Sequence, residues 1–214
     1  MPVDGVVFDL DGTLIDGYEA IHDALSHSLS KLGLPVPTST ETREMVGHGL
    51  ERLLERAAGP GRAAEGVRLF REHYPEVAVA KSHLMPGVES VLAELSRSGI
   101  PMALASNKPP KFSRLILEAR GVAGYFRDIV GPDDLHPPKP DPRMLRALLA
   151  AMESRPERTV CVGDMEVDIE FARAAGCRVI VIPSGSRSRD FLAAAGADLL
   201  IETLEDLPAA LARV

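Results

Sequence analysis

The sequence predicts an α/β fold: a doubly wound, Rossmann-like parallel sheet that carries an inserted α-helical subdomain. Short β-branched runs without polar alternation recur through the second half of the chain, separated by segments with helical periodicity. That pattern is typical of strands covered by helices on both faces. The first two strand-like runs, residues 3–10 and 100–105, lie roughly ninety residues apart, about three times the length of a simple βαβ unit. Because the excess is helical in pattern, it predicts an insertion.

These boundaries divide the chain into a catalytic core, residues 1–15 and 84–214, and a helical cap, residues 16–83. The first strand closes with an acidic turn that contains Asp9 and Asp11. In the cap, leucines and isoleucines at helical spacing predict one helix that ends near Gly33 and a second that ends around residues 59–61. A third, less regular helix is expected to stop near Pro75.

After the cap, helices and strands alternate to the end of the chain. Proline near a helix start and glycine after its end mark several of the boundaries. Helices are expected over residues 88–95, 110–119, 142–152, 166–175 and 190–195, and strands over 100–105, 129–130, 159–162, 178–182 and 198–201. Repeated units of this length indicate a parallel, doubly wound α/β sheet.

Composition narrows the class of partner. The net charge of −7 argues against nucleic acid or an anionic membrane as the main partner. No apolar run approaches the ~18 residues of a membrane span, and the first residues do not resemble a signal peptide, so we expect a cytoplasmic protein. Two cysteines, Cys161 and Cys177, favour reduced thiols over a disulfide framework. Whether the protein is a monomer or a homodimer is left open.

Residues that can carry chemistry stand where the predicted strands end. In a doubly wound sheet, ligands bind beyond the carboxyl ends of the strands, near the point where the strand order reverses. The residues at these ends, together with a lysine from the loop before residues 142–152, are Asp9, Asp11, Ser106, Asn107, Lys139, Asp164 and Asp168. We therefore expect four carboxylates, a hydroxyl and an ammonium group to meet at one edge of the sheet.

Each of these residues except Asp9 also has a structural explanation when it is taken alone. Turn formation explains Asp11 before Gly12, helix capping explains Ser106, and the others suit helix caps or a solvated surface. None of this explains Asp9, an acid that closes an apolar strand. The joint occurrence of these residues, each beside a strand end, favours a functional site over the separate explanations.

A group of carboxylates in one crevice predicts a bound cation. Two carboxylates ~4 Å apart repel by ~4 kcal/mol at an effective dielectric of 20, so protons or a metal must compensate them. Oxygen ligands without histidine or cysteine favour Mg²⁺ over zinc or copper. The lysine fits the same site: the chain has 19 arginines and five lysines, and a compact ammonium suits a single phosphoryl oxygen.

Four segments resemble the sequence motifs of the haloacid dehalogenase-like phosphatases. They are Asp9-Leu10-Asp11-Gly12-Thr13-Leu14-Ile15-Asp16, Ser106-Asn107-Lys108-Pro109, Lys139-Pro140-Asp141-Pro142 and Gly163-Asp164-Met165-Glu166-Val167-Asp168. The inserted helices resemble that family's α-helical cap, and within the family the chain most resembles the phosphoglycolate phosphatase-like subgroup. Met165 stands where the family usually has Thr or Ser, and Gly17 where a small hydroxyl residue is common. Both departures bear on the subgroup and not on the reaction class.

The resemblance implies a phosphomonoester hydrolase that acts through an aspartyl-phosphate. It assigns Asp9 as the nucleophile. Asp11 would protonate the leaving oxygen and then activate water. Ser106, Asn107 and Lys139 would bind the phosphoryl oxygens.

The resemblance also implies Mg²⁺ as the cofactor. Its ligands would be Asp9, the backbone carbonyl of Asp11, and Asp164. Asp168 would support the site without binding the ion itself.

The substrate is expected to be a small phosphorylated metabolite, with 2-phosphoglycolate as the first choice. Another organic phosphate or pyrophosphate remains an alternative, as do a sugar-phosphate mutase and a non-catalytic phosphate-binding module. Asp11 disfavours a binding module, and it also disfavours dehalogenation because the dehalogenases of this superfamily lack that acid. Related mutases carry a cap histidine near position 21. This chain has His22, one position further on and on a different face of the helix, which disfavours a mutase.

The cap is expected to recognise the rest of the substrate. Arg43, His48 and Arg52 are the candidates to meet a substrate carboxylate, since the glycines at 47 and 49 permit close backbone approach. Solvated charges at the start of a helix are the alternative interpretation.

Overall fold

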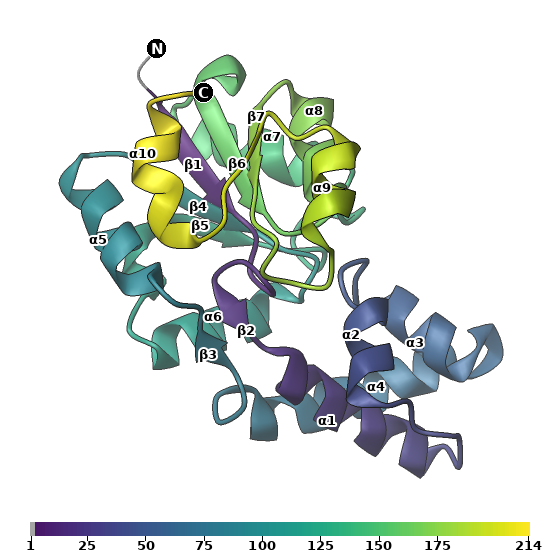
Figure 1. Cartoon of the computed structure of the whole chain (residues 1–214). Coiled ribbons are helices and arrows are strands. Elements are labelled where there is room, and N and C mark those ends of the chain that lie inside the picture. Colours follow the sequence, from purple (N-terminus) through teal and green to yellow (C-terminus); the bar gives the residue numbers. More distant parts are fainter. Residues whose placement is uncertain (1–2) are drawn as a thin grey trace.

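A computed structural model describes residues 3–214; residues 1–2, which the predicted core includes, lie outside the described residues. Its centre is a six-stranded parallel sheet in the order β5-β4-β1-β6-β7-β8 (Figure 1). The strands are β1 (Gly5–Phe8), β4 (Met102–Ala105), β5 (Phe126–Val130), β6 (Thr159–Gly163), β7 (Arg178–Val181) and β8 (Leu199–Leu200). The predicted α/β class is confirmed.

Helices cover both faces of the sheet. One face packs against α5 (Val88–Arg97), α6 (Pro110–Ala119) and α10 (Leu207–Leu211), and the other against α7 (Arg143–Met152), α8 (Glu166–Ala175) and α9 (Arg189–Ala195). Short 3₁₀ turns lie at Ala123–Tyr125, Pro156–Arg158 and Leu204–Asp206. Side chains of β1 alternate between the two cores: Val6 and Phe8 belong to one, Val7 to the other. Both faces of the sheet are therefore buried, as the apolar strands without polar alternation predict.

The strand order reverses at β1. From β1 the chain adds β4 and β5 on one side, then β6, β7 and β8 on the other. The loops that follow β1, β4 and β6 therefore diverge around a crevice at the carboxyl edge of the sheet. No helix within residues 3–214 is long and apolar enough to cross a membrane.

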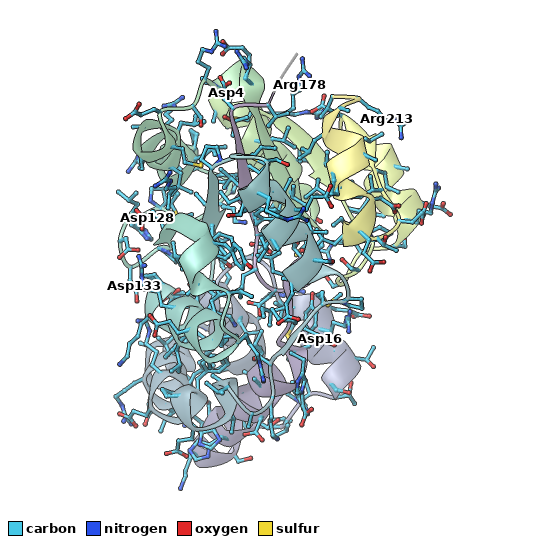
Figure 2. All side chains as sticks on the ribbon, turned by 90° about the vertical axis from the view of Figure 1, so that its left-hand side faces the viewer. Asp4, Asp16, Asp128, Asp133, Arg178 and Arg213 are labelled. Atoms are coloured by element: carbon cyan, nitrogen blue, oxygen red, sulfur yellow. The ribbon has the colours of Figure 1, made fainter. Side chains whose placement is uncertain are left out.

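The inserted segment forms a separate helical layer beyond this edge. It contains α1 (Tyr18–Lys31), α2 (Ser39–Met45), α3 (Leu50–Ala58) and α4 (Pro60–Ala78), with α4 packed against both α1 and α3. The chain leaves the core through β2 (Ile15–Asp16) and returns through β3 (His83–Leu84), and these two strands pair antiparallel. Figure 2 shows Asp16 between the core and the helices of the cap.

One prediction about the cap helices is wrong, and another is confirmed. The third helix does not stop near Pro75, because α4 continues to Ala78 with the proline inside it. Tyr74 and Ala78, on either side of that proline, are fully buried, so tertiary packing offsets the lost backbone hydrogen bond. The predicted end of the second cap helix is confirmed, because α3 ends at Ala58 with Gly59 as its C-cap, and Pro60 is the first residue of α4.

Candidate active site

The loop after β1 is a tight turn that holds two carboxylates at the edge of the sheet. The Asp9 amide donates to Val162 O on β6 (2.9 Å), and three successive amides, residues 13–15, donate to Leu10 O. Gly12 has φ +90°, a conformation that favours glycine. Asp9 and Asp11 are thereby fixed with side chains that are 12% and 11% exposed.

Lys139 lies at the centre of the acidic group. Its Nζ is 2.7 Å from Asp9 Oδ1 and 2.7 Å from Asp168 Oδ1. Burial opposes its charge, but Asp168 and then Asp9 raise the pKa of Lys139 above its ordinary value. The loop that carries it is anchored by Asn107, whose Oδ1 accepts from the Lys139 amide at 2.7 Å. The lysine is thus a fixed, permanent positive charge beside the predicted nucleophile.

Asp9, Asp164 and Asp168 form a group that fits a divalent cation. One carboxylate oxygen from each lies within 4.8 Å of the others. Asp164 is fully buried, and its Oδ2 has no hydrogen-bond partner among the described residues. Burial and then the charge of Asp9 raise the pKa of Asp164 well above its ordinary value. Burial also raises the pKa of Asp168 to about 6, although Lys139 lowers it. A cation beside Asp164 would stabilise the charged form that burial disfavours.

Two glycines enclose the Asp164 carboxylate. A Cβ atom at Gly12 would come within 2.5 Å of Asp164 Oδ2, and one at Gly185 would overlap the same oxygen. Ser184, next to the second glycine, donates from its hydroxyl to Gly12 O at 2.5 Å. The backbones of both glycines therefore pack directly against Oδ2, and a side chain at either position would displace the carboxylate.

The loop after β4 supplies a hydroxyl and an amide. Ser106 is buried, and its Oγ accepts from the Lys108 amide at 3.3 Å. The Asn107 side chain is occupied by the protein itself: Nδ2 donates to Lys139 O (3.2 Å) and to Gly47 O of the cap (3.0 Å). Asn107 therefore connects the lysine loop to the cap, and its predicted contact with phosphate stays a prediction.

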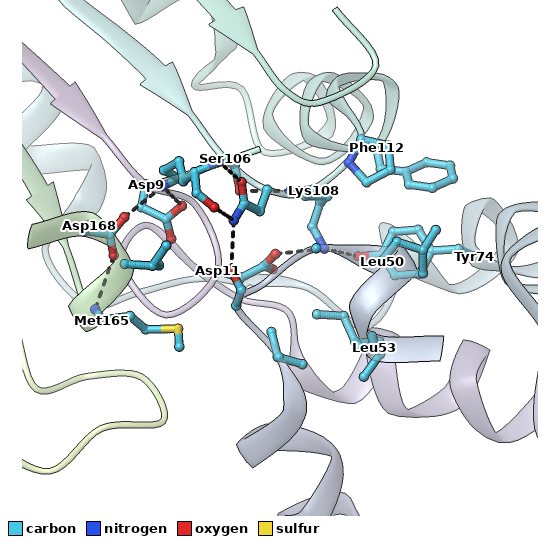
Figure 3. Close-up of a pocket in the computed structure, with 18 of the residues that line it drawn as sticks. Asp9, Asp11, Leu50, Leu53, Tyr74, Ser106, Lys108, Phe112, Met165 and Asp168 are labelled. Carbon is cyan, nitrogen blue, oxygen red and sulfur yellow. Dashed lines mark hydrogen bonds and ion pairs between the residues drawn. The ribbon is translucent and has the colours of Figure 1, made fainter. Parts of the chain in front are cut away.

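A pocket opens between these loops and the cap (Figure 3). Its core side contains Asp9, Asp11, Ser106, Lys139 and Asp168. Its cap side is mostly apolar and is formed by Ile21, Val46, Leu50, Leu53, Phe70 and Tyr74. The pocket thus joins the predicted phosphate-binding groups to an apolar wall.

Lys108 is a pocket residue that the motif contained but to which sequence reasoning gave no role. Its Nζ is 2.9 Å from Asp11 Oδ2 and 2.8 Å from Tyr74 Oη, so it extends from the loop after β4 towards the cap (Figure 3). Burial opposes the charge, but Asp11 and then Tyr74 raise the pKa of Lys108 above its ordinary value. The sequence did contain a signal for a role of Lys108: it is one of only five lysines in the chain, and it lies three residues after the end of the strand predicted over residues 100–105.

The three cap residues that were expected to meet substrate do not line this pocket. Arg43 donates to the carbonyl oxygens of two core residues, 184 and 185, each at 3.1 Å, and lies over the Tyr18 ring. His48 is 4.0 Å from Glu166. The Arg52 side chain is 72% exposed and pairs with a glutamate of its own helix. Their part in specificity stays a prediction.

The geometry suits transfer of a phosphoryl group. Asp9 has one oxygen on Lys139 and the other available to a substrate, and Asp11 stands two residues on with its Oδ1 unpaired among the described residues. Buried cations and hydroxyl or amide donors aimed at one point stabilise the charge that develops on phosphoryl oxygens. The arrangement is therefore compatible with the predicted roles of Asp9 as nucleophile, Asp11 as acid and Lys139 as a phosphate-binding group, which stay predictions.

Comparison with known proteins gives the same result. A family model described as haloacid dehalogenase-like hydrolase matches residues 6–182. A phosphoglycolate phosphatase of Vibrio parahaemolyticus is 33% identical over 94% of this chain and 93% of its own length. One from Yersinia pseudotuberculosis is 35% identical over 95% and 90%. The crystal structure of a predicted phosphoglycolate phosphatase from Haemophilus somnus superposes with a TM-score of 0.89 at 26% identity, covering 97% of both chains. The chain therefore belongs to the haloacid dehalogenase-like hydrolases and is a phosphatase.

Proposed function

We propose that this phosphatase hydrolyses 2-phosphoglycolate, or a phosphomonoester of similar size, through an aspartyl-phosphate on Asp9 with Mg²⁺ as cofactor. The observation that carries the proposal is the contact of Lys139 Nζ with both Asp9 and Asp168. This contact supports the proposal that a nucleophile, a phosphate-binding ammonium group and a metal site share one crevice. A cavity of about 60 Å³, several times the roughly 10–15 Å³ that one water needs, supports a small substrate.

The first half of the reaction moves the phosphoryl group to the protein. The free carboxylate oxygen of Asp9 attacks phosphorus, and the bond from phosphorus to the ester oxygen breaks. Asp11 gives its proton to that oxygen, so the product leaves as an alcohol. Lys139 and the Ser106 hydroxyl hold the equatorial oxygens, whose charge they stabilise in the transition state. The raised pKa of Asp11, caused by burial against the opposing effect of Lys108, suits an acid.

The second half regenerates the carboxylate. Asp11, now ionised, takes a proton from a water molecule, whose oxygen attacks the phosphorus of the aspartyl-phosphate. Orthophosphate leaves and Asp9 is restored. Because the same residue acts first as acid and then as base, the cycle ends with Asp11 protonated, as it began.

The metal would be held by Asp9, the Asp11 carbonyl and Asp164, with Asp168 held in place by Lys139 and by the Met165 amide at 3.2 Å. When bound, Mg²⁺ supplies positive charge that offsets the carboxylates and polarises the phosphoryl group. The unpaired Oδ2 of Asp164 supports this assignment.

The test is a panel of phosphomonoesters, offered to the purified protein with Mg²⁺ and with a chelator. We expect turnover of p-nitrophenyl phosphate and higher kcat/KM for 2-phosphoglycolate, both abolished by chelation. Pyrophosphate and a sugar phosphate serve as competing substrates.

Asp9→Asn is the matched control, since it keeps the shape of the side chain and removes the attacking charge. Its rate should fall by orders of magnitude while the circular dichroism spectrum is unchanged. An Asp9→Asn protein as active as wild type would refute the mechanism. A 2-phosphoglycolate rate below that of every other compound would refute the substrate.

A further inference from the structure

The side of the pocket that faces the leaving group has very little positive charge. Lys139 is committed to the phosphoryl side by its contacts with Asp9 and Asp168. Among the described residues that line the pocket, the remaining positively charged group is Lys108. The surface around it, from both cap and core, is apolar and comprises Ile21, Val46, Leu50, Leu53, Phe70 and Phe112. The part of the substrate beyond the phosphate therefore contacts one ammonium group, that of Lys108, within a mostly apolar surface.

Lys108 is held so that it can make one more hydrogen bond. Its ammonium carries three protons. Two are directed to Asp11 Oδ2 at 2.9 Å and Tyr74 Oη at 2.8 Å, and the third has no acceptor among residues 3–214. The side chain is 6% exposed, so bulk water does little to screen the charge. Tyr74 comes from α4 of the cap, which fixes the direction of the ammonium relative to the cap wall.

We propose that Lys108, positioned by Tyr74, binds the carboxylate of the substrate and selects 2-phosphooxy carboxylates over phosphate esters whose leaving group is uncharged. This inference rests on the proposed function, in which Asp11 protonates the ester oxygen. Because Lys108 Nζ is 2.9 Å from Asp11 Oδ2, a group that bonds to Lys108 must lie close to that ester oxygen. A carboxylate one carbon away meets this condition, and one at the end of a long chain does not.

The charge of the pocket argues for a carboxylate over a second phosphate. A carboxylate brings one negative charge to the one available ammonium. The leaving group of pyrophosphate brings more charge, and it would bring it against an apolar wall and the Asp11 carboxyl group. Burying excess charge without a partner is costly, so pyrophosphate should be a poor substrate.

The decisive experiment compares 2-phosphoglycolate with its neutral amide, 2-phosphoglycolamide, on wild-type protein and on Lys108→Met. The two substrates have nearly the same shape and differ in charge. We expect wild type to prefer the carboxylate by about tenfold to hundredfold in kcat/KM, the range of a buried hydrogen bond to a charged group. In Lys108→Met the preference should fall to within about threefold, chiefly through KM for the carboxylate, because the contact exists before the chemical step. The ratio cancels any effect on Asp11 that both substrates share.

Lys111→Met is the matched control, because that lysine is exposed in the first turn of α6, three residues after Lys108; it should keep the wild-type ratio. Tyr74→Phe removes one of the two partners of Lys108 and should reduce the preference partially. If Lys108→Met does not fold, Tyr74→Phe decides, and an unchanged preference in that variant overturns the inference. Equal rates on carboxylate and amide overturn the inference and leave the phosphatase proposal intact. If the wild-type protein hydrolyses none of the three compounds, 2-phosphoglycolate, 2-phosphoglycolamide and p-nitrophenyl phosphate, the proposed function itself is overturned.

Discussion

Gly185→Ala should weaken metal binding without touching any residue that reacts. A methyl group at this position overlaps Asp164 Oδ2, so the carboxylate must withdraw by more than about 1 Å to restore van der Waals separation. The Gly185 backbone is outside the positive-φ region, so the effect is steric and not conformational. A shift of that size is large compared with the tolerance of Mg²⁺–oxygen distances, which lie near 2.0–2.1 Å.

The expected magnitude follows from the role of Asp164 as a proposed ligand. Displacing the groups that orient a metal ligand typically costs about tenfold to hundredfold in affinity, and the apparent Mg²⁺ constant should rise by at least this factor. Titration calorimetry with Mg²⁺ measures it directly, and the Mg²⁺ dependence of p-nitrophenyl phosphate turnover measures it independently. At saturating Mg²⁺ much of kcat should return.

Gly61→Ala is the control for this substitution. A Cβ there meets nothing within 4 Å, and alanine is favoured over glycine in the first turn of α4. It should leave the Mg²⁺ constant unchanged and slightly raise the stability. A Gly185→Ala protein with a wild-type Mg²⁺ constant would show that Asp164 is not a metal ligand.

Two further outcomes are expected. Asp11→Asn should slow hydrolysis of 2-phosphoglycolate far more than that of p-nitrophenyl phosphate, whose leaving group needs no proton; equal losses on both substrates would remove Asp11 from the role of acid. Hydrogen bonds from Lys81 and then His73 lower the pKa of Asp23 below its ordinary 3.8, so the stabilisation is present above about pH 4 and lost as the pH falls further. Asp23→Asn should therefore reduce the free energy of unfolding at pH 7 by less than about 1 kcal/mol, and denaturant titrations at pH 7 and pH 3 should show a smaller difference at the lower pH.

The sheet and its helices were predictable because local signals agreed with tertiary structure. Proline begins α6 and an acidic first turn begins α8, and both helices have the predicted bounds. The elements that were missed lack apolar periodicity. Helix α2 is seven residues long, largely polar, and is started by a capping box between Thr38 and Glu41. Strands β2 and β3 have two residues each, too few for any alternation to be read.

For the candidate site, sequence order carried much of the information about the core and little about the cap. Asp9 and Lys139 are 130 positions apart, yet their meeting follows from the rule that parallel strands end at one edge. The partnership of Lys108 with Tyr74 follows no such rule, because it depends on how α4 packs over the crevice. Cap specificity was for the same reason assigned to the charged residues around the glycines at 47 and 49, while the described pocket is lined there by apolar side chains.

The antiparallel pairing of β2 with β3 makes the cap an exchangeable module. Since Ile15 lies opposite Leu84 and Asp16 opposite His83, the inserted segment leaves and re-enters the core at neighbouring points. A different insertion could be spliced there without changing the spacing of the loops that hold the phosphoryl group. Selection on substrate range can therefore act on the cap while the chemistry in the core is kept. In this chain the division is incomplete, because Lys108 belongs to the core and its partner Tyr74 to the cap. A transplanted cap without that tyrosine would leave Lys108 with Asp11 and without its hydrogen bond to the cap.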